Sequence, residues 1–131
     1  MRNKLPSEQL SQFLDFVAES QRLYKFCSDA VNTQDKLTQD YLHSLELDEL
    51  SCGERNKLAT KLATNRKDRR YYKDRVEELE HIVKFFDDPA NKKILDKMKQ
   101  VLGQTRKAES YHKDRTYKPR VLKEEMQNEL F

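Results

Sequence analysis

The sequence of 131 residues contains two glycines, three prolines and no tryptophan. Glycine and proline usually make up about 7% and 5% of a protein, and they are the main formers of tight turns. A chain this poor in both residues makes few turns, so we expect long helices. The scarcity of glycine also excludes the glycine-rich loops that hold nucleotide phosphates.

Long apolar runs are missing as well. No stretch approaches the roughly 18 consecutive apolar residues of a membrane span, and Met1–Pro6 lacks the apolar run of a signal peptide. The only two cysteines, Cys27 and Cys52, do not form a C-x-x-C motif. These absences predict a reduced, cytoplasmic protein with no membrane partner.

What the chain has in abundance is charge. Charged residues make up 37% of the sequence and the mean hydropathy is −1.04. Such a chain buries a narrow seam and solvates the rest, so a monomer has a thin core. We therefore expect a homo-oligomer.

Apolar and small residues recur three and four positions apart, which predicts three helices. The first runs from Ser7 to about Glu46. The second follows a capping box in which Ser51 accepts the Glu54 amide and the Glu54 carboxylate reaches back to the Ser51 amide. The third begins at 87–89, where acidic residues precede a proline.

The third helix is expected to fade near Arg115, because Pro119 forces the preceding residue out of the helical conformation. Its expected packing stripe, with Leu95 and Leu102 alongside, is Ile94, Met98, Val101, Thr105, Ala108 and His112. The predicted fold is all-α: an elongated antiparallel helical hairpin or coiled coil with a third helix and a basic C-terminal tail. Residues 1–114 form the domain, and residues 115–131 form a tail that is partly disordered or a short helix.

Short connections between helices predict antiparallel neighbours. Across the first turn, this register sets Gln34 beside Asn65 and Asp29 beside Arg69. Across the second turn it sets Lys107 beside Arg69. Helices and short turns alone lead to this arrangement.

Two stretches carry most of the positive charge. Arg55–Arg75 holds nine basic and two acidic residues, and Lys92–Lys123 holds eleven and three, although the net charge is only +3. The predicted register brings the two stretches side by side as one composite basic patch. Its members are Arg66, Lys67, Arg69, Arg70, Tyr71, Lys73, Arg106, Lys107, Tyr111, His112, Lys113 and Arg115.

The composite patch has two interpretations. Converging Arg and Lys side chains attract phosphates, and tyrosine rings can stack on bases, so the partner is nucleic acid, a nucleotide or an acidic protein surface. Alternatively, the patch is a solvated helix surface whose charge is offset by neighbouring carboxylates: Asp29, Asp35, Asp68 and Asp74. Arg69 interrupts the apolar stripe and needs a partner, either Asp29 or a ligand.

The segment Arg115–Arg120 is a separate candidate, because an extended basic and aromatic arm can grip nucleic acid or a protein groove. An ordinary disordered terminus is the alternative.

Metal and catalytic chemistry have weak signals. Glu78 and Glu109 each precede a histidine by three residues, the spacing of di-iron bundles. In the predicted register His81 and His112 are about 26 Å apart, too far to share a metal. No motif pairs the cysteines with the histidines. We therefore predict no metal, no cofactor, no catalytic residues and no enzymatic activity.

Four phrases of the sequence resemble small helical proteins encoded in prophages of Gram-positive bacteria. They are Asp35–Leu47, Arg66–Arg70, Val76–Glu80 and Arg115–Leu122. The resemblance implies an accessory protein of phage origin in the cytoplasm of a bacterial host cell, and it implies no particular chemistry.

Together these observations predict a non-enzymatic phage-related accessory protein. It binds nucleic acid, or a host complex that handles nucleic acid, through its Arg, Lys and Tyr surface. Two alternatives stay open: a protein-interaction or inhibitor module, for example against a host defence system, and a structural coiled-coil assembly factor.

Overall fold

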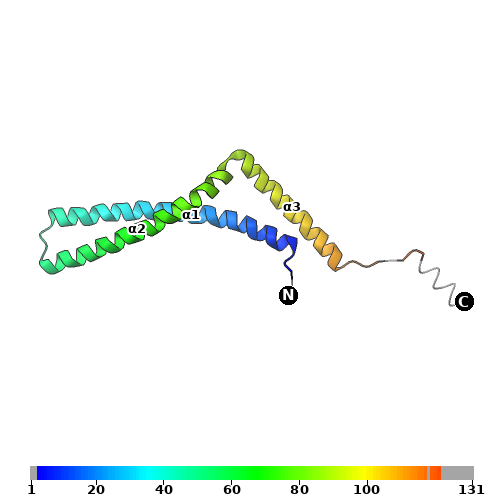
Figure 1. The fold of residues 1–131 in the computed structure, drawn as a ribbon, viewed down its shortest axis with the longest axis horizontal. Coiled ribbons are helices and arrows are strands. Elements are labelled where there is room, and N and C mark those ends of the chain that lie inside the picture. The colour runs from blue at the N-terminus through cyan, green and yellow to red at the C-terminus, as the bar shows by residue number, and fades with distance from the viewer. Residues whose placement is uncertain (1–2, 118, 122–131) are drawn as a thin grey trace.

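The computed structural model describes residues 3–117 and 119–121. These residues form three helices, α1 (Pro6–Leu47), α2 (Cys52–Asp87) and α3 (Pro89–Lys113), and no strand. Helices α1 and α2 make a long antiparallel hairpin, and α3 leaves the far end of α2 at an angle (Figure 1). The predicted all-α, elongated hairpin with a third helix is confirmed.

The helix ends follow the expected capping residues. The Ser51 hydroxyl accepts the Glu54 amide at 3.2 Å, as predicted, and the Glu54 carboxylate accepts from the Ser51 hydroxyl at 3.0 Å instead of from the Ser51 amide. At α3, the Asp88 side chain accepts the Ala90 amide at 2.9 Å and Pro89 fills the first helical position. These caps satisfy amides that have no partner inside the helix.

Helix α3 ends two residues before Arg115. The described tail residues, Arg115–Tyr117 and Pro119–Val121, are exposed and outside any helix. The short helix expected after Val121 falls on residues 122–131, which lie outside the described part of the chain.

The core is the narrow seam between α1 and α2 that the stripes predict. Val17 and Cys27 of α1 and Val83 of α2 are buried in it. The stripe expected for α3 is partly wrong: Met98 and Thr105 are half-buried and Leu102, expected alongside the stripe, is buried, whereas Ile94 and Val101 are about half exposed. The packing face of α3 depends on the direction in which it leaves α2, and that direction differs from the predicted one.

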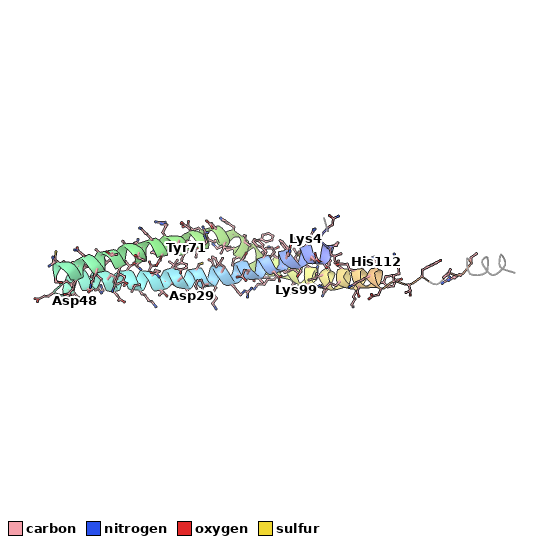
Figure 2. The ribbon with its side chains drawn as sticks, turned by 90° about the horizontal axis from the view of Figure 1, so that it is seen from below. Lys4, Asp29, Asp48, Tyr71, Lys99 and His112 are labelled. Atoms are coloured by element: carbon pink, nitrogen blue, oxygen red, sulfur yellow. The ribbon has the colours of Figure 1, made fainter. Side chains whose placement is uncertain are left out.

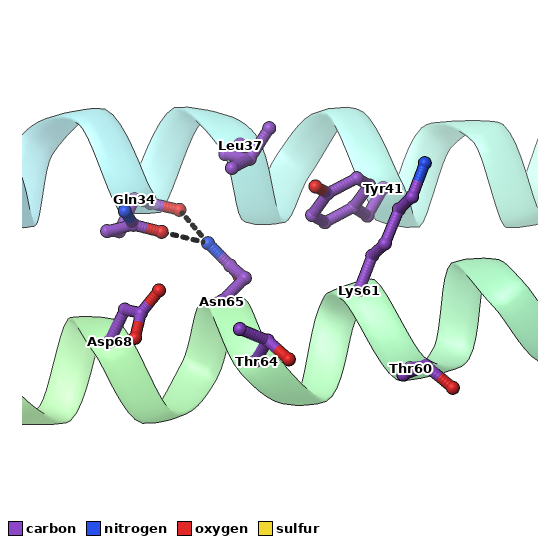
Figure 3. A pocket seen from close by; sticks show the side chains of 8 residues that line it. All are labelled: Gln34, Leu37, Tyr41, Thr60, Lys61, Thr64, Asn65 and Asp68. Atoms are coloured by element: carbon purple, nitrogen blue, oxygen red, sulfur yellow. Dashed lines mark hydrogen bonds between the residues drawn. The ribbon is translucent and has the colours of Figure 1, made fainter.

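A buried polar layer crosses the seam near the middle of the hairpin. Asn65 is only 3% exposed, and its side-chain amide donates to the Gln34 carbonyl oxygen at 3.0 Å and to Gln34 Oε1 at 2.7 Å (Figure 3). The Thr38 hydroxyl lies 2.6 Å from Asn65 Oδ1 and donates to it. The predicted pairing of Gln34 with Asn65 is therefore confirmed.

The connection between α2 and α3 is a bend and not a hairpin turn. Asp88 is the only residue between the two helices, and its backbone is extended (φ −60°, ψ 130°). Helical hairpins take about two to five connecting residues to reverse the chain. Helix α3 consequently continues away from the α1–α2 turn and lies beside the start of α1 (Figures 1 and 2). There Arg106 Nη2 lies 3.5 Å from Ser11 Oγ. The predicted antiparallel register of α2 with α3 is wrong.

Replacing Asn65 tests the polar layer. Asn65→Ala removes the layer's central amide, so the polar groups of Gln34 and Thr38 that face it lose a hydrogen-bond partner. We therefore expect the free energy of unfolding to fall by about 2–3 kcal/mol. Chemical denaturation followed by circular dichroism measures this change. Thr60→Ala, on the exposed side of α2, is the control and is expected to change stability by less than about 0.5 kcal/mol. Equal effects of the two variants would contradict the role of the layer.

Candidate anion-binding surface

The bend at Asp88 divides the composite basic patch in two. Arg69 contacts Asp35 and Arg106 contacts Ser11, and these two α1 residues are about 36 Å apart at the rise of a helix. The expectation that the two basic stretches lie side by side is therefore wrong. We call the members from α2 the α2 group: Arg66, Lys67, Arg69, Arg70, Tyr71 and Lys73. Those from the end of α3 and beyond form the α3 group: Arg106, Lys107, Tyr111, His112, Lys113 and Arg115.

Arg69 has an acidic partner, but it is Asp35 and not the expected Asp29. Arg69 Nε lies 2.5 Å from Asp35 Oδ1, with 19% of the arginine side chain exposed. Side chains on a helix lean toward its N-terminus, so Arg69 leans toward the α1–α2 turn while Asp35 leans away from that turn. The two side chains therefore converge. Asp29 lies about level with Arg69 in the register set by Gln34 and Asn65, so the two side chains lean away from each other, and Asp29 is exposed.

Most of the positive charge of α2 is not offset by carboxylates. Of the nine basic residues between Arg55 and Arg75, only two form ion pairs among the described residues: Arg69 with Asp35, and Arg75 with Glu78 at 2.7 Å. Seven basic side chains therefore have no acidic partner within 4.0 Å there. Besides Asp35, three carboxylates were expected to neutralise the basic patch. None of them forms an ion pair in the described part of the chain: Asp29, Asp68 and Asp74.

Four of these seven side chains share one face of α2. Arg55, Arg66, Arg70 and Lys73 are spaced eleven, four and three residues apart, which brings all four to the same side of a helix. We call them the α2 basic face. It extends about 27 Å along the helix axis, a length over which one strand of a nucleic acid duplex carries about eight phosphates. Charges spread over this distance match a polyanion better than a single phosphate.

Tyr71 lies within the α2 group and has aromatic and cationic neighbours. Its ring centroid is 5.5 Å from that of Tyr72 in an edge-on arrangement, and the Arg75 guanidinium carbon lies 5.4 Å from the Tyr71 centroid. More than half of Tyr71 stays exposed, so the ring remains accessible to a bound molecule.

Acidic residues, Glu109 and Asp114, lie between the members of the α3 group. Tyr111 and His112 are exposed neighbours with ring centroids 5.8 Å apart. Glu109 lies on the same turn, and both of its carboxylate oxygens are buried without a hydrogen-bond donor among the described residues. A carboxylate at this position weakens the attraction of the α3 group for anions. Sequence reasoning missed Glu109 as a buried group, because the side on which α1 approaches α3 is set by the bend.

The described residues contain no group of three His, Cys, Asp or Glu side chains placed to hold a metal ion. Both cysteines are free thiols. Burial raises the pKa of the Cys27 thiol, and the nearby Arg75 partly counteracts that rise. Cys27 is therefore a poor nucleophile at neutral pH, since the thiolate is the reactive form. Within the described part of the chain, no helix has the length and apolarity to cross a bilayer.

Comparisons with known proteins find no matching family model and no significant match among curated proteins or solved structures.

The ion pair of Arg69 can be tested against its predicted alternative. Asp35→Ala leaves a mostly buried guanidinium without its carboxylate, so we expect the free energy of unfolding to fall by about 1 kcal/mol, a modest loss because Asp35 is partly exposed. Asp29→Ala is the matched control and is expected to change stability by less than about 0.5 kcal/mol. Urea denaturation of both variants measures the difference, and a larger loss for Asp29→Ala would contradict the assignment.

Proposed function

We propose that this protein is a non-enzymatic binding protein that holds nucleic acid by its phosphate backbone along the α2 basic face. The observation that carries the proposal is that most basic side chains between Arg55 and Arg75 form no ion pair among the described residues. The seam takes up one arginine of the α2 group, Arg69, through Asp35, and leaves its neighbours Arg66, Arg70 and Lys73 without an ion pair among the described residues. Unpaired Arg and Lys side chains bind phosphates by replacing condensed counterions.

The shape of the surface supports backbone binding over base reading. A straight helix with basic residues on one face can follow a phosphate backbone, and this contact carries no sequence information. Tyr71 is one residue from Arg70 and two from Lys73, so it lies on a different side of α2 and takes no part in this contact. Under this proposal the protein binds with little sequence preference and with a strong dependence on salt. In the setting that the prophage resemblance implies, it acts as an accessory protein in a bacterial host cell.

The salt dependence of binding tests this proposal. We expect Arg66→Ala combined with Arg70→Ala to weaken binding of a labelled oligonucleotide at least about tenfold, and to lower the slope of log affinity against log salt by about two, one for each lost phosphate contact. Fluorescence anisotropy with single-stranded and duplex DNA and RNA, at several salt concentrations, measures both quantities.

The matched control is Lys92→Ala combined with Lys93→Ala. Both lysines are exposed on the first turn of α3, away from the α2 basic face, so the affinity and the salt slope should stay near those of the unaltered protein. An unaltered protein that binds none of these nucleic acids, or an Arg66/Arg70 variant that binds like the control, would refute the proposal. The protein-interaction alternative would then be the better account.

A further inference from the structure

The chain exposes much more surface than a globular monomer of its mass. A monomeric protein of 15.7 kDa exposes about 7,300 Å², whereas this chain exposes 11,091 Å². An extended chain with the mass of residues 114–131 exposes about 3,300 Å², and with that amount subtracted the total still exceeds the value expected for the remaining mass by about 1,300 Å². A stable interface takes about 800 Å² from each partner, so the excess is large enough for one.

Large apolar side chains on α1 mark where such an interface lies. Phe16, Leu23 and Phe26 are 51%, 38% and 61% exposed, and they are spaced seven and three residues apart on a side of α1 distinct from the buried stripe of Val17 and Cys27. We call these three residues the α1 aromatic flank. Isolated exposed apolar residues are common on protein surfaces, but a row of them on one helix face is typical of an interaction site.

The charges on this flank are self-complementary in one orientation only. Glu19 and Arg22 lie between the apolar residues, are well exposed and form an ion pair with each other. When two copies of α1 lie antiparallel about a two-fold axis between residues 20 and 21, Glu19 of each copy opposes Arg22 of the other, and Phe16 comes close to Phe26. A parallel, in-register pair instead opposes like charges, which is destabilising.

We propose that a second copy of this chain covers the α1 aromatic flank, in an antiparallel two-fold dimer. The excess surface and the apolar row leave room for an interface, and the self-complementary charges favour a second copy as its occupant. The aromatic ring of Phe26 lies edge-on to that of Tyr72 at 6.1 Å, so the apolar surface continues from α1 onto α2. The dimer is independent of the proposed nucleic-acid function.

Sedimentation equilibrium of the full chain over micromolar concentrations tests the dimer. We expect the unaltered chain to show twice the monomer mass, and Phe16→Lys combined with Phe26→Lys to raise the dimer dissociation constant at least about tenfold. Ile94→Lys combined with Val101→Lys is the matched control, because these α3 residues are similarly exposed but lie off the flank. Circular dichroism confirms that each variant is folded.

A charge exchange gives a second readout that does not depend on the apolar residues. Glu19→Arg and Arg22→Glu should each weaken the dimer when present alone, and an equal mixture of the two variants should recover the dimer mass, because each supplies the charge that the other lacks. A monomeric unaltered chain would overturn the proposal. So would a Phe16/Phe26 variant that still dimerises, a control variant that dissociates, or a mixture that stays monomeric.

Discussion

The structure depends on the hydrogen bonds of one buried asparagine. Asn65 is the most buried polar side chain of the seam, and its amide reaches both oxygens of Gln34 while Thr38 donates to its carbonyl oxygen. An apolar seam with a repeating spacing can slide along itself and pack again, but a slide here leaves a buried amide without partners. The cost of about 1–3 kcal/mol for each unsatisfied group is large against a typical stability of 5–15 kcal/mol. The polar layer therefore sets the register of the α1–α2 hairpin.

The surfaces of the molecule follow from this register and from the bend at Asp88. The register brings Asp35 to Arg69 and leaves Arg55, Arg66 and Arg70 exposed on another side of α2. The bend takes the basic end of α3 to the start of α1, where Arg106 meets Ser11. The protein consequently presents separate surfaces: a basic face on α2 that suits a polyanion, and an aromatic flank on α1 that suits a second copy of the chain.

Local signals in the sequence predict much of this fold. Ser51, Asp88 and Pro89 mark where helices begin, and the three-and-four spacing identifies the seam down to the pairing of Gln34 with Asn65. The same signals do not predict the direction in which one helix leaves the previous one. A cap shows where α3 starts but not the angle at which it leaves α2, although the single residue between two helices was a usable sign against a hairpin. Arg69 pairs with Asp35 instead of Asp29 because side chains lean toward the N-terminus of their helix. A register counted from backbone positions alone does not include this lean.

The central claim is that the two basic groups lie far apart, and a distance between them tests it most directly. Spin labels on cysteines introduced at Arg70 and Lys107, in a Cys52→Ser background that leaves the buried Cys27 unlabelled, allow pulsed electron resonance to measure this distance. Excess unlabelled protein suppresses distances between copies. The account predicts a separation of at least about 25 Å along the hairpin. A separation near 10 Å, the distance between packed helices, would contradict it and restore a single composite patch.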